Sequence, residues 1–481
     1  MNNLQRLASN TTLAFISNIV VKASSALLFI LVGRTLGAAE AGIFNLGVTY
    51  FTIVLALSAW GLHELIVREV APRRGESRQY LLHYLGLRLL LALGAYGLLL
   101  LLLRLNLPYT PHAKQVIQVF ALAMFPEAIF VLLQGVFAAH ERLLVPTIAA
   151  AVNGGLKLGI GLWVLGHNGD AVGLAWAMVV GSGVSLVVFM PALLHLFRHI
   201  PQQPARLSSR FALSQLRLTP GFIVIGFFTT IDYQLDAFLI SLFLSEAELG
   251  WYGAAQTVML AFWMMPTALR TALYPLMARY YHESPERLPA LYRRANRYIL
   301  VGALPICAGI SLIAPSIIPL IFDSGFQPAI PALQIIIWAV LPSFLMVPSA
   351  RLLLVYNRQS EAGWFTALSM AANLLLNLWL IPRWGITGAA IARVLATSFF
   401  FVALYLYVQR RLLRDSLLPL LLRPILATLL MCAAVWPLRH LFIVWPISAG
   451  ILVYPLALLL LRAIPPEDQR LLYQFLKRSP N

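Results

Sequence analysis

The chain has 481 residues, of which 60% are hydrophobic and only 11% are charged, and its mean hydropathy is +0.81. A soluble protein of this length cannot cover its surface with so few charged residues, so the composition predicts a polytopic membrane protein. The net charge of +17 would indicate nucleic-acid binding in a soluble domain. In a membrane protein the same excess lies beside lipid head groups, so we expect anionic membrane lipids, and no nucleic acid, as partners.

Fourteen apolar runs are each long enough to cross a hydrocarbon core of about 30 Å as a helix. In chain order they are 11–32, 43–65, 82–103, 115–139, 145–165, 172–195, 219–243, 251–278, 296–321, 330–355, 363–381, 387–409, 424–443 and 446–462. The first run carries Lys22 in its middle and is too long for a signal peptide, so we interpret it as an uncleaved span. In the fifth, Gly155 and Gly159 form a G-x-x-x-G pattern that predicts close helix approach. The predicted fold is an all-α polytopic membrane protein.

A pattern that follows the first span recurs after the seventh at a constant offset of 208 residues. The matched residues are Leu36, Ala39, Glu40, Gly42 and Phe44 in the first copy and Leu244, Ala247, Glu248, Gly250 and Tyr252 in the second. This offset is too long for a solenoid repeat and predicts two six-helix pseudo-repeat lobes. We expect an N-lobe at 1–205, a C-lobe at 206–412, and a tail at 413–481 with two further spans and a cytoplasmic end.

The loops predict the orientation of the chain. If the N-terminus is cytoplasmic, the inner segments hold 24 of the 35 basic residues and the outer segments hold five. The positive-inside rule therefore predicts a multi-pass protein with both termini in the cytoplasm.

Six basic residues remain inside the predicted spans: Lys22, Arg88, Lys157, Arg270, Arg351 and Arg393. A charge facing lipid at mid-bilayer costs about 2.5 to 3.5 kcal/mol, so each is expected to face protein or water. Arg88 and Arg351 lie close enough to the inner interface to snorkel. The other four are predicted to line a cationic cavity, and paired burial against Glu127, Asp232 or Asp236 is the alternative for them.

Helical spacing places polar residues on common faces. Such pairs, four residues apart, are Asn18 with Lys22, Asn153 with Lys157, and Asn373 with Asn377, and we expect their side chains to line the cavity. Asp232 and Asp236 are also four apart, and Glu127 follows Pro126 in the fourth span. These three acids either pair with basic residues or bind the H⁺ or Na⁺ that drives transport.

Motifs for enzymes and metal sites are missing from the sequence. It has no G-x-x-x-x-G-K-[ST] sequence for ATP and no G-x-S-x-G nucleophile elbow. His63-Glu64 and His140-Glu141 both lack the second histidine of a zinc-binding H-E-x-x-H motif. We therefore expect no enzyme activity, no metal and no cofactor, apart from a coupling H⁺ or Na⁺.

Two short motifs in the first half resemble those of a known family. They are G-R-x-L-G…G-x-F (Gly33, Arg34, Leu36, Gly37, Gly42, Phe44) and V-R-E (Val67, Arg68, Glu69). With Asp236 sixteen residues before Tyr252, the chain resembles, over nearly its whole length, the bacterial polysaccharide flippases (PST type) of the multidrug/oligosaccharidyl-lipid/polysaccharide exporter superfamily.

The resemblance implies a flippase of the bacterial inner membrane that moves a lipid-linked oligosaccharide, typically on undecaprenyl pyrophosphate, to the outer leaflet. Such proteins supply O-antigen lipopolysaccharide or exopolysaccharide synthesis by alternating access of two lobes around a cationic cavity. The motifs assign Arg34 and Arg68 to the substrate and Asp236 to coupling or charge pairing. A polysaccharide polymerase and a chain-length regulator are candidate partners, and the flippase is expected to be a monomer.

Three alternatives remain open. One is a cation-coupled multidrug exporter of the same superfamily, and another is a flippase for a lipid-linked peptidoglycan precursor. The third is a non-transporting scaffold, a membrane glycosyltransferase or a polymerase. The six basic residues named above outnumber the three acids Glu127, Asp232 and Asp236, which favours an anionic cargo over organic cations. A polymerase would carry a large periplasmic loop, and the sequence has none.

Overall fold

A computed structural model describes residues 3–463 except 200–207, 209–210, 212–213, 216–219, 264 and 414. Side chains are further left undescribed at 3–18, 220–226, 263, 265–268, 270–272 and 359. All regular secondary structure in the described residues is helical, which confirms the predicted all-α fold. In the described residues helices cover most of each of the fourteen predicted spans, and nine helical stretches are long and apolar enough to cross a membrane.

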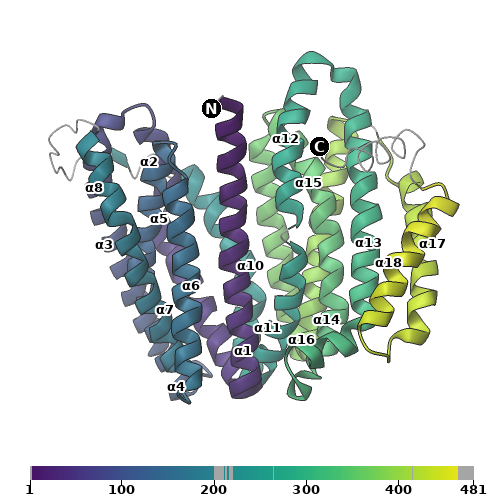
Figure 1. Ribbon diagram of the computed structural model, residues 1–481, viewed down its shortest axis with the longest axis horizontal. Helices are drawn as coiled ribbons and strands as arrows, with labels where there is room; N and C mark the ends of the chain where they lie inside the picture. Colours follow the sequence, from purple (N-terminus) through teal and green to yellow (C-terminus); the bar gives the residue numbers. More distant parts are fainter. Residues whose placement is uncertain are drawn as a thin grey trace, which may run out of the picture. The chain divides into compact units, whose positions relative to one another are not determined.

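The first compact unit comprises Met1–Gly253 with Ile381–Ile386 (Figure 1). Its helices are α1 (Asn3–Ala59), α2 (Leu62–Val70), α3 (Ser77–Leu103), α4 (Pro111–Leu122), α5 (Met124–Ala139), α6 (Leu144–Gly166), α7 (Ala171–Ser185), α8 (Phe189–His199), α10 (Pro220–Phe243) and the first part of α11 (Glu246–Trp263). The long α1 packs against α3, α4, α6 and α10, and α6 packs against α7. The unit is thus a helical bundle organised around α1.

The second compact unit comprises Ala254–Leu380 and Thr387–Asn481. Its further helices are α12 (Met265–Glu283), α13 (Leu288–Ile321), α14 (Ala329–Ile336), α15 (Val340–Val355), α16 (Gln359–Arg411), α17 (Leu418–Val435) and α18 (Val444–Leu460). Helix α13 packs against α14, α15 and α17, and α17 pairs with α18. The thirteenth span begins before its predicted start at 424, because Pro419 is tolerated in the first turn of α17.

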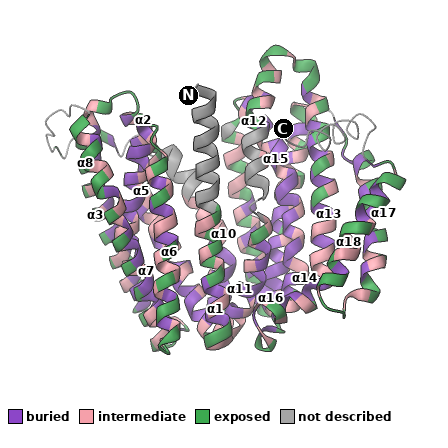
Figure 2. Cartoon of the chain, in the orientation of Figure 1, coloured by how far each residue is buried: buried purple, intermediate pink, exposed green. Residues whose placement is uncertain are grey.

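Large apolar side chains lie on the outer faces of the helices. Leu90 and Leu93 on α3, Leu422 on α17, and Leu452 and Leu460 on α18 are all more than half exposed (Figure 2). In water this much exposed apolar surface would cause aggregation, whereas in a bilayer it contacts acyl chains. The exposed faces therefore agree with a multi-pass membrane protein.

Helix α1 contains two predicted spans and ends earlier than expected. The spans at 11–32 and 43–65 join across a kink at Gly37, whose φ is 85°. The second span is interrupted at Trp60 and Gly61, which both have positive φ, before α2 begins. The sequence does not signal this break because the apolar run continues through it.

The prediction that Arg88 snorkels is wrong. Its side chain is only 2% exposed, and Nη1 donates a hydrogen bond of 3.4 Å to the carbonyl oxygen of Ala59, the last residue of α1. The carbonyls at a helix C-terminus carry partial negative charge, so the break at Trp60 provides a polar environment for a buried guanidinium. Arg88 therefore stabilises the end of α1 from inside the bundle.

The two copies of the repeated pattern contact each other through their glycines. A Cβ atom added to Gly42 of α1 would overlap the carbonyl oxygen of Glu246, and one added to Gly250 of α11 would overlap the carbonyl oxygen of Ala38. The backbones of α1 and α11 therefore touch at this crossing. The expectation for Gly155 and Gly159 is wrong, because among the described residues no neighbouring helix places an atom within 4 Å of the Cβ position of either.

The glycine contact gives the first prediction. Gly42→Ala should destabilise the protein by about 1 to 3 kcal/mol, because the new methyl group forces the two backbones apart. Gly94→Ala on α3 is the matched control, since no atom of another described element lies within 4 Å of its Cβ position. Thermal unfolding of the purified variants measures the difference. Equal stability of the two variants would contradict the close approach.

Candidate functional site

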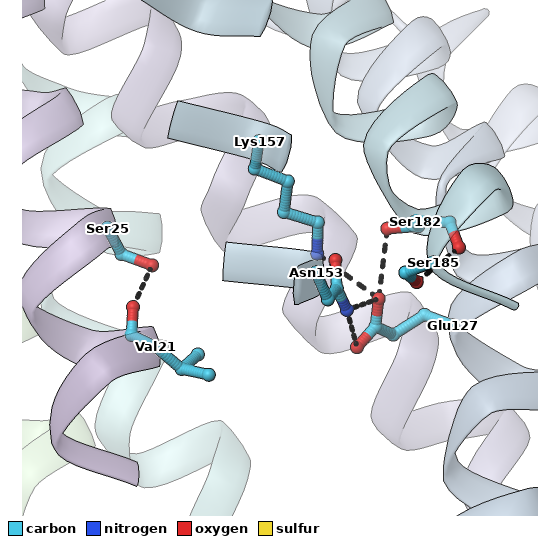
Figure 3. Close-up of polar contacts among 7 residues, drawn as sticks. All are labelled: Val21, Ser25, Glu127, Asn153, Lys157, Ser182 and Ser185. Carbon is cyan, nitrogen blue, oxygen red and sulfur yellow. Dashed lines mark hydrogen bonds and ion pairs between the residues drawn. The ribbon is translucent and has the colours of Figure 1, made fainter. Parts of the chain in front are cut away.

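Four polar side chains from three helices meet inside the first unit, and we call them the Glu127 cluster (Figure 3). One carboxylate oxygen of Glu127, Oε2, accepts hydrogen bonds from Lys157 Nζ at 3.2 Å and from Ser182 Oγ at 3.0 Å. Asn153 Nδ2 lies 3.4 Å from the same oxygen and 3.5 Å from Oε1. The cluster therefore neutralises one partly buried positive charge with one negative charge.

The local sequence explains why these side chains converge. The fourth predicted span is divided at Ala123 into α4 and α5, and Glu127 lies in the first turn of α5. The partial positive charge of a helix N-terminus stabilises a carboxylate at this position. On α6, Asn153 and Lys157 are four residues apart and share one face, as the spacing predicts.

Close packing of α6 on α7 directs the lysine toward the carboxylate. A Cβ atom at Gly181 would lie 2.9 Å from Lys157 Cγ, so the glycine leaves room for the lysine chain to pass. The side chains of Lys157 and Glu127 are 20% and 16% exposed. The ion pair is therefore only partly buried.

The structure thus shows that Lys157 and Glu127 pair with each other, which is the alternative to an unpaired lysine in a cationic cavity. In this conformation Lys157 is a neutralised cation, and a competing anion would have to displace Glu127. Its role in substrate binding stays a prediction.

Asp236 and Tyr252, which the sequence analysis singled out by their spacing, are directly bonded. The Tyr252 hydroxyl donates to Asp236 Oδ2 at 2.7 Å, and both side chains are fully buried. A buried carboxylate needs such a donor, which gives the spacing of sixteen residues a structural reason. Asp232, one turn earlier on α10, is partly buried.

Three predicted residues of the second unit lie on α16. Asn373 and Asn377 are fully buried, and Asn377 Nδ2 donates to both the backbone carbonyl and Oδ1 of Asn373 at 2.9 and 3.0 Å. Arg393 is 5% exposed, and its backbone carbonyl accepts a hydrogen bond from Thr397. The predicted polar face of α16 is therefore directed into protein.

The remaining predicted residues lie on exposed surface or outside the description. Lys22, Arg34 and Arg68 are exposed, and Arg68 Nη2 forms an ion pair of 2.9 Å with the neighbouring Glu69. The side chains of Asn18 and Arg270 fall outside the described residues.

Sequence reasoning missed Ser182 and a second polar cluster near the kink of α1. Glu40 Oε1 lies 3.1 Å from His112 Nε2 on α4, and Glu40 Oε2 accepts a hydrogen bond from the backbone N–H of Ala171 at the start of α7. Glu40 was visible only as part of the repeated pattern, and nothing in the sequence pairs it with His112. In the described residues, no group of three His, Cys, Asp or Glu side chains could hold a metal ion.

The second prediction concerns the coupling between Glu127 and Lys157. Lys157→Met leaves a carboxylate without its cation, so it should destabilise the protein, and adding Glu127→Gln should restore part of the loss. A double-mutant cycle in thermal or denaturant unfolding should give a coupling energy of about 1 to 3 kcal/mol. Additive effects of the two substitutions would show that the ion pair contributes nothing to stability.

Comparison with known proteins identifies a related family. A family described as "Polysaccharide biosynthesis protein" matches residues 31–331, and a family described as "Lipid II flippase MurJ" matches residues 217–455. A curated relative, the "Probable low-salt glycan biosynthesis flippase Agl15" of Haloferax volcanii, is 24% identical over 163 residues. That alignment covers 34% of this chain and 34% of the relative, so the chain matches about a third of the relative's length.

Solved structures share the fold at low sequence identity. A structure titled "Lipid II flippase MurJ, inward closed conformation" has a TM-score of 0.75 and 13% identity, with 94% of this chain and 98% of that chain covered. An inward-facing multidrug resistance MATE family transporter of the MOP superfamily has a TM-score of 0.67 and 15% identity, with 82% and 94% covered. These likenesses establish the fold.

Proposed function

Because the chain belongs to the polysaccharide biosynthesis protein family, we propose that it is a flippase that moves a lipid-linked oligosaccharide across the bacterial inner membrane. The proposed substrate is carried on undecaprenyl pyrophosphate and supplies surface polysaccharide synthesis. The protein transports its substrate without covalent chemistry, as a monomer with both termini in the cytoplasm. Its proposed partners are anionic lipids, a polysaccharide polymerase and a chain-length regulator.

The observation that carries this proposal is Lys157, a cation kept deep in a membrane span with a fifth of its side chain exposed. A diphosphate bears negative charge, and two unit charges 4 Å apart attract by about 4 kcal/mol at an effective dielectric constant near 20. Once it is released from Glu127, Lys157 can therefore contribute substantially to holding the head group. The apolar exposed faces of the helices leave the lipid tail in the bilayer during this step.

In the proposed mechanism the head group enters from the cytoplasmic side and is held by the basic residues of a central cavity. Alternating access then opens the cavity to the outer leaflet. Lys22 and Arg270 are the further basic residues proposed for this cavity, with Asn153 as a neutral lining residue. The support for these assignments is their depth in the spans and their helical spacing.

Two neighbouring functions have specific observations in their favour. The match of residues 217–455 to the lipid II flippase family favours a lipid-linked peptidoglycan precursor as cargo. The fold of the MATE transporters, together with the acids Glu127 and Asp236, favours a cation-coupled multidrug exporter. Purified protein in vesicles, offered a lipid-linked oligosaccharide, lipid II or a fluorescent organic cation in parallel, separates the three functions by which cargo moves.

The third prediction is that Lys157→Ala and Arg270→Ala each slow translocation of a fluorescent undecaprenyl-diphosphate oligosaccharide at least about tenfold, a loss of about 1.4 kcal/mol. Translocation is measured as access of an external quencher to the label. Lys114→Ala, a change of basic residue outside the predicted cavity, is the control and should retain the rate. Wild-type rates in both variants, with normal insertion, would remove these residues from the mechanism.

A further inference from the structure

The proposed function, on which this inference rests, leaves one step unexplained. Lys157 is neutralised by Glu127, so an arriving anion meets an ion pair and not a cation. Holding the head group therefore requires that Glu127 lose its negative charge or move away. Protonation of the carboxylate does this without moving a helix.

The Glu127 cluster contains a side chain, Asn153, that can bind the protonated acid. Asn153 is 5% exposed, and among the described residues no donor lies within hydrogen-bond reach of its side-chain oxygen Oδ1. The amide currently donates to the ionised carboxylate through Nδ2. When the amide rotates by half a turn, Oδ1 faces Glu127 and accepts a hydrogen bond from a carboxylic O–H. Asn153 thus complements both protonation states, and the buried oxygen gains its missing donor in the protonated one.

Other polar and charged groups remain near Glu127 when the lysine leaves. Ser182 on α7 has a hydroxyl that both donates and accepts. Arg88 on α3 interacts electrostatically with Glu127 and with Glu64 on α2. In the described parts of α1 and α4, no side chain forms a hydrogen bond or ion pair with Glu127. Of the basic side chains that the structure describes, Lys157 alone is in hydrogen-bond contact with Glu127, which makes Lys157 the partner released on protonation.

We propose that Glu127 is a proton-binding site that controls whether Lys157 is available to a diphosphate anion. In the resting state the carboxylate of Glu127 holds Lys157 Nζ. A proton from water binds a Glu127 oxygen and bonds to Asn153, and the ammonium of Lys157 exchanges the carboxylate for a phosphate oxygen. One proton is taken up for each anion bound, and no covalent bond of the anion is broken.

The coupling can be measured in both directions. If protonation raises the affinity for the anion, binding of the anion must raise the affinity for the proton by the same factor. A suitable probe is P1,P2-dimethyl diphosphate, a diester like the proposed substrate, whose two charges do not titrate near neutral pH. Binding to the full-length protein in nanodiscs is measured by calorimetry between about pH 8 and about pH 5.

For wild type, affinity for the diester should rise up to about tenfold per pH unit as pH falls, until Glu127 is protonated. Glu127→Gln mimics the protonated acid and should bind at the tight, low-pH level throughout, with no dependence on pH. Glu64→Gln, which removes the acid on α2, should keep the wild-type pH profile. Lys157→Gln should bind weakly at every pH.

A second measurement covers the case in which Glu127→Gln does not fold. Wild-type protein titrated in buffers of different ionisation enthalpy should take up one proton per diester above the pH at which Glu127 is protonated. Binding without proton uptake, or an unchanged pH profile in Glu127→Gln, overturns the proton site and leaves the anionic cargo intact. Failure of wild type to bind the diester at any pH overturns both the site and the proposed anionic cargo.

Discussion

Charge inside hydrocarbon must be neutralised or hydrated, and the first unit is arranged around this constraint. Lys157 is neutralised by Glu127 across α5 and α6, and Asp236 receives the hydroxyl of Tyr252. Arg88 is placed at the carbonyl end of α1, where the chain turns away from the helix. Each of these arrangements costs less free energy than a charge facing lipid. Of these three arrangements, the Lys157 pair alone combines opposite full charges with partial exposure, and this combination makes it a candidate for binding as well as for stability.

The backbone contact between the two copies of the repeated pattern has a different role. Gly42 and Gly250 bring α1 and α11 together at backbone distance, next to the polar contacts of Glu40 with His112 and Ala171. Small residues permit this approach where no hydrophobic driving force between helices exists in lipid. The same residues that reveal a duplication in the sequence therefore make a packing contact in the fold.

Much of the fold could be predicted because lipid imposes simple rules on composition and span length. The spacing of Asn153 and Lys157 correctly predicted a shared face, and the spacing of Asp236 and Tyr252 marks two residues that are bonded in the structure. The partner of Lys157 could only be named as one of several acids, since helix order along the chain does not determine which helices touch. Ser182 was missed because a single serine in an apolar helix has no periodic signal, and the break at Trp60 was missed because the apolar run continues through it.

The central claim is that a diphosphate head group takes the place of Glu127 as the partner of Lys157. The most direct measurement is an experimental structure of the full-length protein with an undecaprenyl-diphosphate oligosaccharide bound, at a resolution that shows side chains. The account predicts a phosphate oxygen within about 4 Å of Lys157 Nζ, with Glu127 turned to Asn153. A bound diphosphate held by other residues, with Lys157 still paired to Glu127, would contradict it.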